Sequence, residues 1–392
     1  MATARKASKT QSKLMTLLFG EPFTGKSTLA MQVAYFKRPD GKPFRVLYLD
    51  AENGSIDDYL EKLEADGVNL DNLYIVYSQS LGEVREYIRK VRTNEDFYEL
   101  DEDGNETNVV VTDADGNPFR ADAIVIDGTT ILHLSTKAGL TEFSKKRNKV
   151  KAEKEGLIGD AKLVKIAGAG LELKDYNTIN FKGQDLILDL MGCGVHCIVT
   201  ARETDEKTQI KDKDGNSVSV ATGRKIADGF KGLDYNVKTV IRTYRNEDGV
   251  VCAEFRKDRT ETHPDGEIVI DPTLLDYQNV IDRTAKNKNF TVKNNLQDSV
   301  GIEQEIYKKE ILKEVGSVSV NEVKEETETV NVASDSNNAD AIKAQITTIL
   351  KALKPTEKAT AKKKLTDANL PIDYTKVTDV EVLNRILSTL SA

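Results

Sequence analysis

Short apolar runs alternate with amphipathic segments from Leu14 to about Asp282. The runs have the length of buried strands, and the amphipathic segments have the spacing of helices. Strand and helix in repeated alternation predict an α/β fold, a mainly parallel sheet with helices on both faces. The predicted strands are Leu14–Phe19, Val46–Leu49, Leu73–Tyr77, Ala123–Ile126 and Val195–Val199, and the predicted helices are Ser27–Phe36, Ile56–Ala65, Leu81–Val91 and Gln184–Met191.

The pattern changes after Arg202. Turn sequences at 212–216, 246–249 and 264–266 separate β-rich stretches, among them Val237–Tyr244 and Val250–Arg256. Strands joined by short turns form antiparallel pairs. We therefore expect antiparallel strands appended to the parallel sheet.

Residues 95–122 form an acidic insertion in this pattern. Two Asp-Gly-Asn turns, at 103–105 and 115–117, flank the apolar stretch Val109–Val111, which predicts solvent-exposed hairpins. The spacing of the aspartates does not fit the calcium loop of an EF-hand.

The remaining segments lie at the two ends of the chain. Residues 1–13 are a basic tail, residues 14–285 the core, and residues 286–338 a polar, acidic stretch that we expect to be a largely disordered linker, with a short helix at Ile306–Val315. Residues 339–392 have helical spacing again, which predicts a three-helix domain of marginal stability.

Composition and charge narrow the class of protein. No apolar run approaches 18 residues, and the basic tail is not followed by the apolar h-region of a signal peptide, so we expect neither a membrane span nor a secretory signal. Three cysteines without a CxxC pair indicate a reducing, cytoplasmic compartment. The formal charge of the 392-residue chain is −8, but the insertion carries −9 and residues 301–340 carry −6, which leaves +7 on the other 324 residues. The net charge therefore does not exclude a nucleic-acid partner.

A phosphate-binding loop follows the first strand. Gly20-Glu21-Pro22-Phe23-Thr24-Gly25-Lys26-Ser27 matches GxxxxGK[ST] and opens the predicted helix that continues with Thr28. In such a loop the backbone N–H groups and the helix N-terminus face the phosphates of ATP. Lys26 is expected to contact the β- and γ-phosphates, and Ser27 to bind Mg²⁺.

Asp127 ends the buried strand pattern that begins at Ala123. A carboxylate at this place can hold Mg²⁺ directly or through water. The alternative is that Asp127 caps the next segment.

The stretch after the second strand resembles the RecA family of P-loop ATPases. It contains Asp50-Ala51-Glu52, then Tyr59, a Gly-Val-Asn-Leu-Asp-Asn-Leu stretch at 67–73, and Ser78-Gln79. The resemblance implies a RecA-like core in which Glu52 activates the attacking water and Tyr59 stacks on adenine. Packing of Tyr59 in the core is the alternative.

Two later features agree with this resemblance. The strand at Val195 ends in Thr200, where the family has a residue that senses the γ-phosphate. RecA has a glutamine there, and this chain offers Thr200 or Arg202 instead. Lys257 and Arg259 follow a later strand, where the family places cations that reach the neighbouring subunit's ATP. A solvated hairpin end is the alternative for this pair.

Nucleic acid could bind in two basic segments. One contains Lys145, Lys146, Arg147, Lys149 and Lys151, and the other, residues 203–227, contains Arg224 and Lys225. Lysines in exposed loops would contact backbone phosphates without reading the base sequence. Tyr176 and Phe181 either stack on bases or pack in the core.

The core, roughly residues 14–282, resembles the small RecA-like ATPases of bacteriophages that take part in recombination and single-strand annealing, and the last 110 residues lie outside this resemblance. This implies a Mg²⁺-dependent ATPase that assembles with itself as a ring or filament and acts on single-stranded DNA, in the bacterial host cytoplasm if a phage encodes it. The alternatives are a nucleotide-gated adaptor that recruits a replication or single-strand-binding protein through its C-terminal region, and a P-loop kinase of a small molecule.

Overall fold

The computed structural model describes residues 4–211, 215–290 and 296–315, together with 343, 346, 364–366, 370–371, 377 and 379–391. The chain divides into two compact units, Met1–Ile311 and Leu312–Ala392. Within the described ranges, no helix combines the length and the apolar character that a membrane crossing needs.

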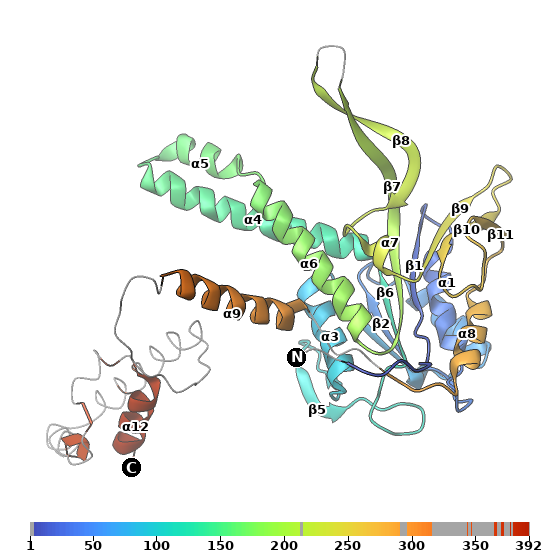
Figure 1. Ribbon diagram of the computed structural model, residues 1–392, viewed down its shortest axis with the longest axis horizontal. Coiled ribbons are helices and arrows are strands. Elements are labelled where there is room, and N and C mark those ends of the chain that lie inside the picture. The colour runs from blue at the N-terminus through green and yellow to red at the C-terminus, as the bar shows by residue number, and fades with distance from the viewer. Residues whose placement is uncertain are drawn as a thin grey trace. The chain divides into compact units, whose positions relative to one another are not determined.

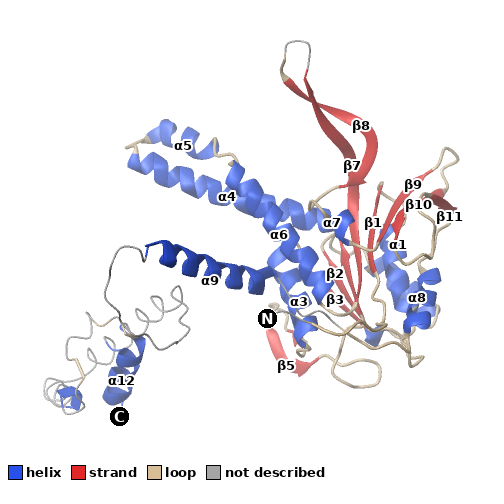
Figure 2. Ribbon diagram, viewed as in Figure 1, coloured by secondary structure: helices blue, strands red, loops and turns tan. Residues whose placement is uncertain are grey.

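A nine-stranded sheet is the centre of the first unit (Figures 1 and 2). Its order is β11-β10-β9-β1-β7-β6-β2-β3, and β8, outside this order, pairs with β7. The strands from β9 to β3 in this order run parallel, whereas β10, β11 and β8 are antiparallel additions. The strands are β1 (Met15–Gly20), β2 (Val46–Asp50), β3 (Leu73–Tyr77), β6 (Ala123–Asp127), β7 (His196–Lys211), β8 (Ser217–Ala227), β9 (Thr239–Arg245), β10 (Val251–Asp258) and β11 (Glu267–Ile270).

Helices cover both faces of this sheet because its central strands bury side chains on both sides. In β1, Leu17 and Phe19 pack on one side and Leu18 on the other. The first side is covered by α3 (Leu81–Thr93), α4 (Thr129–Lys154) and α6 (Leu173–Gly192), and the second by α1 (Lys26–Met31), the short helix Gln32–Tyr35, α2 (Asp57–Ala65) and α8 (Gln278–Thr284). The predicted α/β fold with appended antiparallel strands is confirmed.

Two long projections leave this core (Figure 1). One is the hairpin of β7 and β8. The other is a helical arm made of α4, α5 (Gly159–Ala167) and the start of α6. With 26 residues, α4 is about 39 Å long. The bidentate pair of Arg147 with Asp175, at 3.0 and 2.6 Å, fastens α4 to α6. The arm therefore projects as a braced structure and not as a loose loop.

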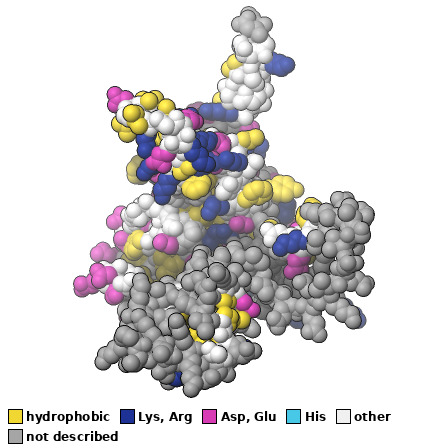
Figure 3. Space-filling view, turned by 90° about the vertical axis from the view of Figure 1, so that its left-hand side faces the viewer, with side chains coloured by type: hydrophobic (Ala, Val, Ile, Leu, Met, Phe, Trp, Pro, Cys, Tyr) yellow, Lys and Arg dark blue, Asp and Glu magenta, His cyan; other side chains and the backbone are white. Residues whose placement is uncertain are grey.

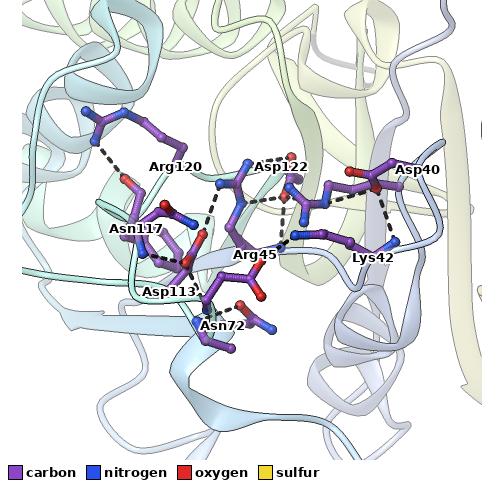
Figure 4. Close-up of polar contacts among 12 residues, drawn as sticks. Asp40, Lys42, Arg45, Asn72, Asp113, Asn117, Arg120 and Asp122 are labelled. Carbon is purple, nitrogen blue, oxygen red and sulfur yellow. Dashed lines mark hydrogen bonds and ion pairs between the residues drawn. The ribbon is translucent and has the colours of Figure 1, made fainter.

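The acidic insertion is anchored to the core by two buried rings, Phe97 and Phe119. Its hairpin of β4 (Tyr98–Leu100) and β5 (Glu106–Val110) is largely exposed, as the turns predict. The second turn is different, because Asp113 is buried and pairs with Arg45, which also binds Asp122 at 2.9 Å (Figure 4). This cluster lies where β2 and β6 begin, at the amino edge of the sheet.

Helices also occur after the core. The helix α9 spans Leu296–Val315, about twice the length predicted for this region, and α12 spans Val380–Ser391. In the second unit the described residues Ile346, Leu365, Leu370, Leu383 and Ile386 are buried together. Residues 316–342, which include the second part of the predicted linker, and most of the first two predicted C-terminal helices lie outside the described residues.

Candidate nucleotide-binding site

The carboxyl ends of four neighbouring parallel strands meet at one edge of the sheet. Pairing aligns Gly20 at the end of β1 with Arg202 of β7, and Asp50 at the end of β2 with Asp127 of β6. In open α/β sheets, ligands bind outside this edge. The predicted site residues of these strands are therefore brought together by sheet register.

The phosphate-binding loop has the predicted strand before it and the predicted helix after it. Gly20 is required because a Cβ there would lie 1.9 Å from the carbonyl oxygen of Thr243 on β9. Gly25, at φ 78°, forms the N-cap of α1 in the left-handed region. Thr24 is buried and its hydroxyl bonds the Glu21 carbonyl and the Thr243 hydroxyl. The loop is thus held against β9.

Lys26 lies at the start of α1, within the loop. Its ammonium donates to the Glu21 carbonyl oxygen at 2.5 Å. Burial lowers the pKa of Lys26, while the negative charges of Glu52, Asp127 and Glu203 act in the opposite direction. These carboxylates therefore share the local electrostatic environment of Lys26 although they come from other strands.

Phe23 stands at the exposed tip of the loop, next to the exposed Pro22. Its backbone has φ 56°, an unusual conformation for a residue with a side chain, and its carbonyl accepts a hydrogen bond from Arg245 at 2.9 Å. The ring is 90% exposed. The loop therefore holds an aromatic ring in solvent at a cost in backbone strain.

Asp127 is buried and accepts three hydrogen bonds. Tyr48 and Ser55 donate to one carboxylate oxygen, at 2.7 and 2.6 Å, and Thr200 donates to the other. Burial raises the pKa of Tyr48, and the charge of Asp127 adds to this effect. Thr200 also accepts the N–H of Gly128 at 2.8 Å. Thr200 is thus bound to Asp127, and its role as a sensor of the γ-phosphate stays a prediction.

The residues present fit a magnesium ion. A serine hydroxyl and a carboxylate are oxygen ligands of the kind that Mg²⁺ takes, usually with several waters. A carboxylate offers about four lone-pair positions, and the three hydrogen bonds to Asp127 leave one for the ion or its water. Ser27 and Asp127 would hold the ion here.

Asp50 shapes the loop that carries Glu52. It is fully buried and accepts the N–H groups of Glu52, Gly54 and Ser55 at 2.8 to 2.9 Å. Asn53 and Gly54 turn the backbone through positive φ. One carboxylate therefore places both Glu52 and Ser55, and Ser55 in turn binds Asp127. Asp50 had no role of its own in the sequence-based predictions, and the signal that they did not use is the Asn53-Gly54 pair, a typical turn sequence.

Glu52 lies partly exposed at the edge of the site. It pairs with Arg202 at 3.1 and 3.2 Å. A Cβ on Gly128 would lie 2.7 Å from Cγ of Glu52, so the glycine leaves the space in which this side chain lies. Neither the role of Gly128 nor the ion pair between Glu52 and Arg202 was predicted from the sequence. Both depend on the contact of the ends of β2, β6 and β7.

Tyr59 lies beside the loop on α2. Its phenol oxygen accepts a hydrogen bond from Thr28 at 2.6 Å, and the ring lines a small cavity with Met31, Tyr35 and Leu63. Tyr59 is half-buried and belongs to neither core cluster of the sheet. Its role under adenine stays a prediction.

Lys257 and Arg259 are not brought to the loop of their own chain. The ammonium of Lys257 donates to the carbonyls of Asp234, Tyr235 and Val237, at the end of α7 (Leu233–Asn236). Burial lowers the pKa of Lys257, and the charge of Arg259 adds to this. Arg259 is exposed, and within the described part of the chain its guanidinium has no ion pair.

The first basic segment lies on helix α4, so the prediction that it forms a loop is wrong. This segment is bonded to α5 by Asn148, which donates to the Lys165 carbonyl at 2.9 Å, and it also contacts α6, which stabilises the helix. Three of the five cations form ion pairs: Arg147 with Asp175, Lys145 with Glu142, and Lys151 with Glu172. Lys146 and Lys149 are exposed and, among the residues described, form no ion pair. Figure 3 shows lysine and arginine side chains among apolar ones on this arm.

The aromatic residues of the arm are exposed. Phe181 is 66% exposed on α6, and Tyr176 on α6 and Phe143 on α4 are about half exposed. The alternative of core packing for Tyr176 and Phe181 is therefore wrong. In the second basic segment, Arg224 and Lys225 lie on β8 and pair with Glu206 and Asp205 of β7.

Comparisons with known proteins add little to this geometry. No family model matches the chain, and no curated protein matches it. Among solved structures, the KaiC-like protein PH0186 of the archaeon Pyrococcus horikoshii OT3 is similar, with 17% identity and a TM-score of 0.34 over 67% of this chain and 91% of that one. The fold class therefore rests on the sheet and loop of this chain itself.

Proposed function

We propose that this chain is a Mg²⁺-dependent ATPase. The observation that carries the proposal is the meeting of Lys26, Asp127 and Glu52 at one edge of the sheet, each held by a bonded network. Lys26 and the loop N–H groups bind the phosphates, Ser27 and Asp127 hold the ion, and Glu52 takes a proton from the attacking water. The bound ion would neutralise charge on the phosphates.

The proposal includes single-stranded DNA and assembly with further copies of the chain. The exposed rings of Phe143, Tyr176 and Phe181 beside exposed lysines on the arm support stacking on bases and contact with phosphates. The arm begins at Gly128, directly after Asp127, and Thr129 bonds the carbonyl of Thr200 at 2.6 Å. A conformational change around the bound phosphates would therefore be transmitted to the arm over a short distance. Hydrolysis between subunits, with Lys257 and Arg259 acting in trans, belongs to the same proposal.

The Glu52–Arg202 pair favours a second candidate, a nucleotide-gated adaptor that recruits a replication or recombination partner. In this pair the guanidinium of Arg202 binds the carboxylate oxygen Oε1 of Glu52, one of the two oxygens that could accept a proton from water. In this candidate, ATP binding changes the conformation at the carboxyl edge of the sheet, and ATP is hydrolysed slowly.

Replacing Glu52 with Gln separates the two. The ATPase predicts retained ATP binding with turnover lowered about a hundredfold or more, and stimulation of the unchanged chain by single-stranded DNA. Glu61→Gln, an exposed glutamate on α2, is the matched control. Unchanged turnover in Glu52→Gln would remove Glu52 from the mechanism, and no stimulation by DNA would favour the adaptor.

A further inference from the structure

Phe23 is an exposed aromatic ring that the site described above does not use. It is 90% exposed at the tip of the phosphate-binding loop, and within the described residues its ring contacts no other ring or cation. The loop holds it there in a left-handed backbone conformation fixed by Arg245. A rigid, exposed aromatic side chain is typical of a residue that anchors a protein interface.

A cavity of about 300 Å³ lies elsewhere on the same core, between β9, β10, α7 and the base of the β7–β8 hairpin. An apolar cavity of about 150 Å³ is enough for benzene. Its apolar lining includes Phe19, Ile226 and Tyr235, and its cationic lining includes Arg224, Arg256 and Arg259. We call it the basic pocket. Tyr235 is 76% exposed, and the Arg256 guanidinium stacks 5.2 Å from the ring of Phe19.

We propose that Phe23 of one subunit inserts into the basic pocket of the next subunit. This inference rests on the proposed function, because Lys257 and Arg259, the residues proposed to reach the neighbour's phosphates, line the same pocket. If they reach those phosphates, the pocket must face the neighbour's phosphate-binding loop, where the ring of Phe23 is 90% exposed. Cations around the ring add attraction to its π face.

The charges of the two surfaces are complementary. The loop side carries the partly exposed Glu21 and Glu52. The pocket side carries four cations, three arginines and Lys257, and the acid Asp234. Arg224 pairs with Glu206 and Arg256 with Glu254, whereas Arg259 has no ion pair among the described residues. Opposite potentials steer partners together and fix their register.

The loop and the basic pocket lie on different sides of the core, so Phe23 does not occupy the pocket of its own chain. Phe19 and Val240 of the pocket belong to the cluster beneath α3, α4 and α6, whereas the loop runs into α1 on the other face of the sheet. Contact between two different surfaces of identical chains is head-to-tail and produces a ring or a filament. The pocket therefore selects a second copy of this chain as its occupant.

A photo-crosslink at position 23 tests the proposal. Phe23 is replaced by p-benzoyl-phenylalanine in the full chain, which is irradiated with a non-hydrolysable ATP analogue and single-stranded DNA. We expect a covalent dimer whose partner peptide lies in 224–240 or 253–260. Tyr235→Ala should lower the dimer yield roughly tenfold, since it removes an aromatic wall of the pocket. Ile158→Ala, which removes an 83% exposed side chain from the arm, should leave the yield unchanged.

The outcomes separate this inference from the proposed function. Crosslinks within one chain, to nucleotide or DNA alone, or to another part of the partner would overturn the docking of Phe23 even if the chain assembles and hydrolyses ATP. If sedimentation with ATP and DNA shows only monomers, hydrolysis between subunits fails and the docking fails with it. ATP binding and turnover, measured in parallel, test the ATPase by itself.

Discussion

Single residues at the edge of the sheet depend on one another through buried carboxylates. Asp50 folds the loop that carries Glu52 and Ser55, and Ser55 with Tyr48 and Thr200 holds Asp127. A buried acceptor that satisfies several N–H groups is costly to remove, about 1–3 kcal/mol for each donor left unpaired. The position of the proposed base is therefore set by side chains that do not touch the nucleotide.

Gly128→Ala should lower ATP turnover about a hundredfold, because misplacement of Glu52 by about 1 Å has an effect of this size. The added Cβ would lie 2.7 Å from Cγ of Glu52, and φ of 96° strains alanine by about 1–2 kcal/mol. Steady-state turnover and a denaturant melt measure the two effects. Gly139→Ala is the control. Gly139 lies on α4, the helix that Gly128 caps, and an added Cβ there would meet nothing within 4 Å. Equal turnover in both variants would contradict the role of Gly128.

The lowered pKa of Lys26 predicts how nucleotide affinity depends on pH. In the free chain burial favours loss of the proton, whereas bound phosphates favour its retention. Nucleotide affinity should therefore fall as pH rises, and the fall should begin below the pH at which an ordinary lysine, of pKa about 10.4, would cause it. Titration of a fluorescent ATP analogue at several pH values measures this. Lys26→Arg should remove the fall, since arginine stays charged, and an affinity that rises with pH would refute the prediction.

At the scale of elements, the helical arm is a rigid extension of the site. It starts at the end of β6 and is fastened by Arg147 to Asp175 and by Ser144 to the Gly170 carbonyl at 2.6 Å. Arg147 thus stabilises the arm, while the exposed lysines of the arm remain available to a partner. Replacement of Arg147 should loosen the contact of α4 with α6. It should lower DNA affinity because the arm then no longer holds its shape.

Lys146→Ala with Lys149→Ala should weaken binding of single-stranded DNA and lower its salt slope. Each lysine that no longer neutralises a phosphate reduces the slope by about 0.7, so the slope of the double variant should be smaller by about 1.4. Binding measured at several salt concentrations gives this value. Lys42→Ala removes a lysine at the other edge of the sheet and should leave the slope unchanged. An unchanged slope in the double variant would exclude the arm as the phosphate footprint.

At the scale of the whole molecule, the proposed site is completed by another copy. Arg259→Ala subunits and Glu52→Gln subunits should each be inactive alone and regain turnover when mixed. In a random mixture roughly one interface in four joins an intact Glu52 to an intact Arg259. ATP hydrolysis against mixing ratio measures this, with the double variant mixed into either parent as the control. A mixture without recovery would show that the two residues do not act across an interface.

The fold was largely predictable because strand length, helix spacing and the phosphate-binding loop are local signals. The strands β1, β2, β3 and β6 lie within a residue or two of their predicted bounds. The arm was not predictable in the same way, because the apolar residues of α4 form no distinct stripe along one face. The stability of α4 and α5 comes from packing against each other and α6.

The sequence by itself determined the α/β class, the loop Gly20–Ser27 and the strand ends at Asp50 and Asp127, since each is a pattern of neighbouring residues. Only the tertiary structure decided which side chains meet. The register of β2, β6 and β7 brings Asp50, Asp127 and Thr200 to one edge, and the close approach of Gly128 leaves space for Glu52. Contacts between distant segments depend on strand order and packing, which no short stretch of sequence contains.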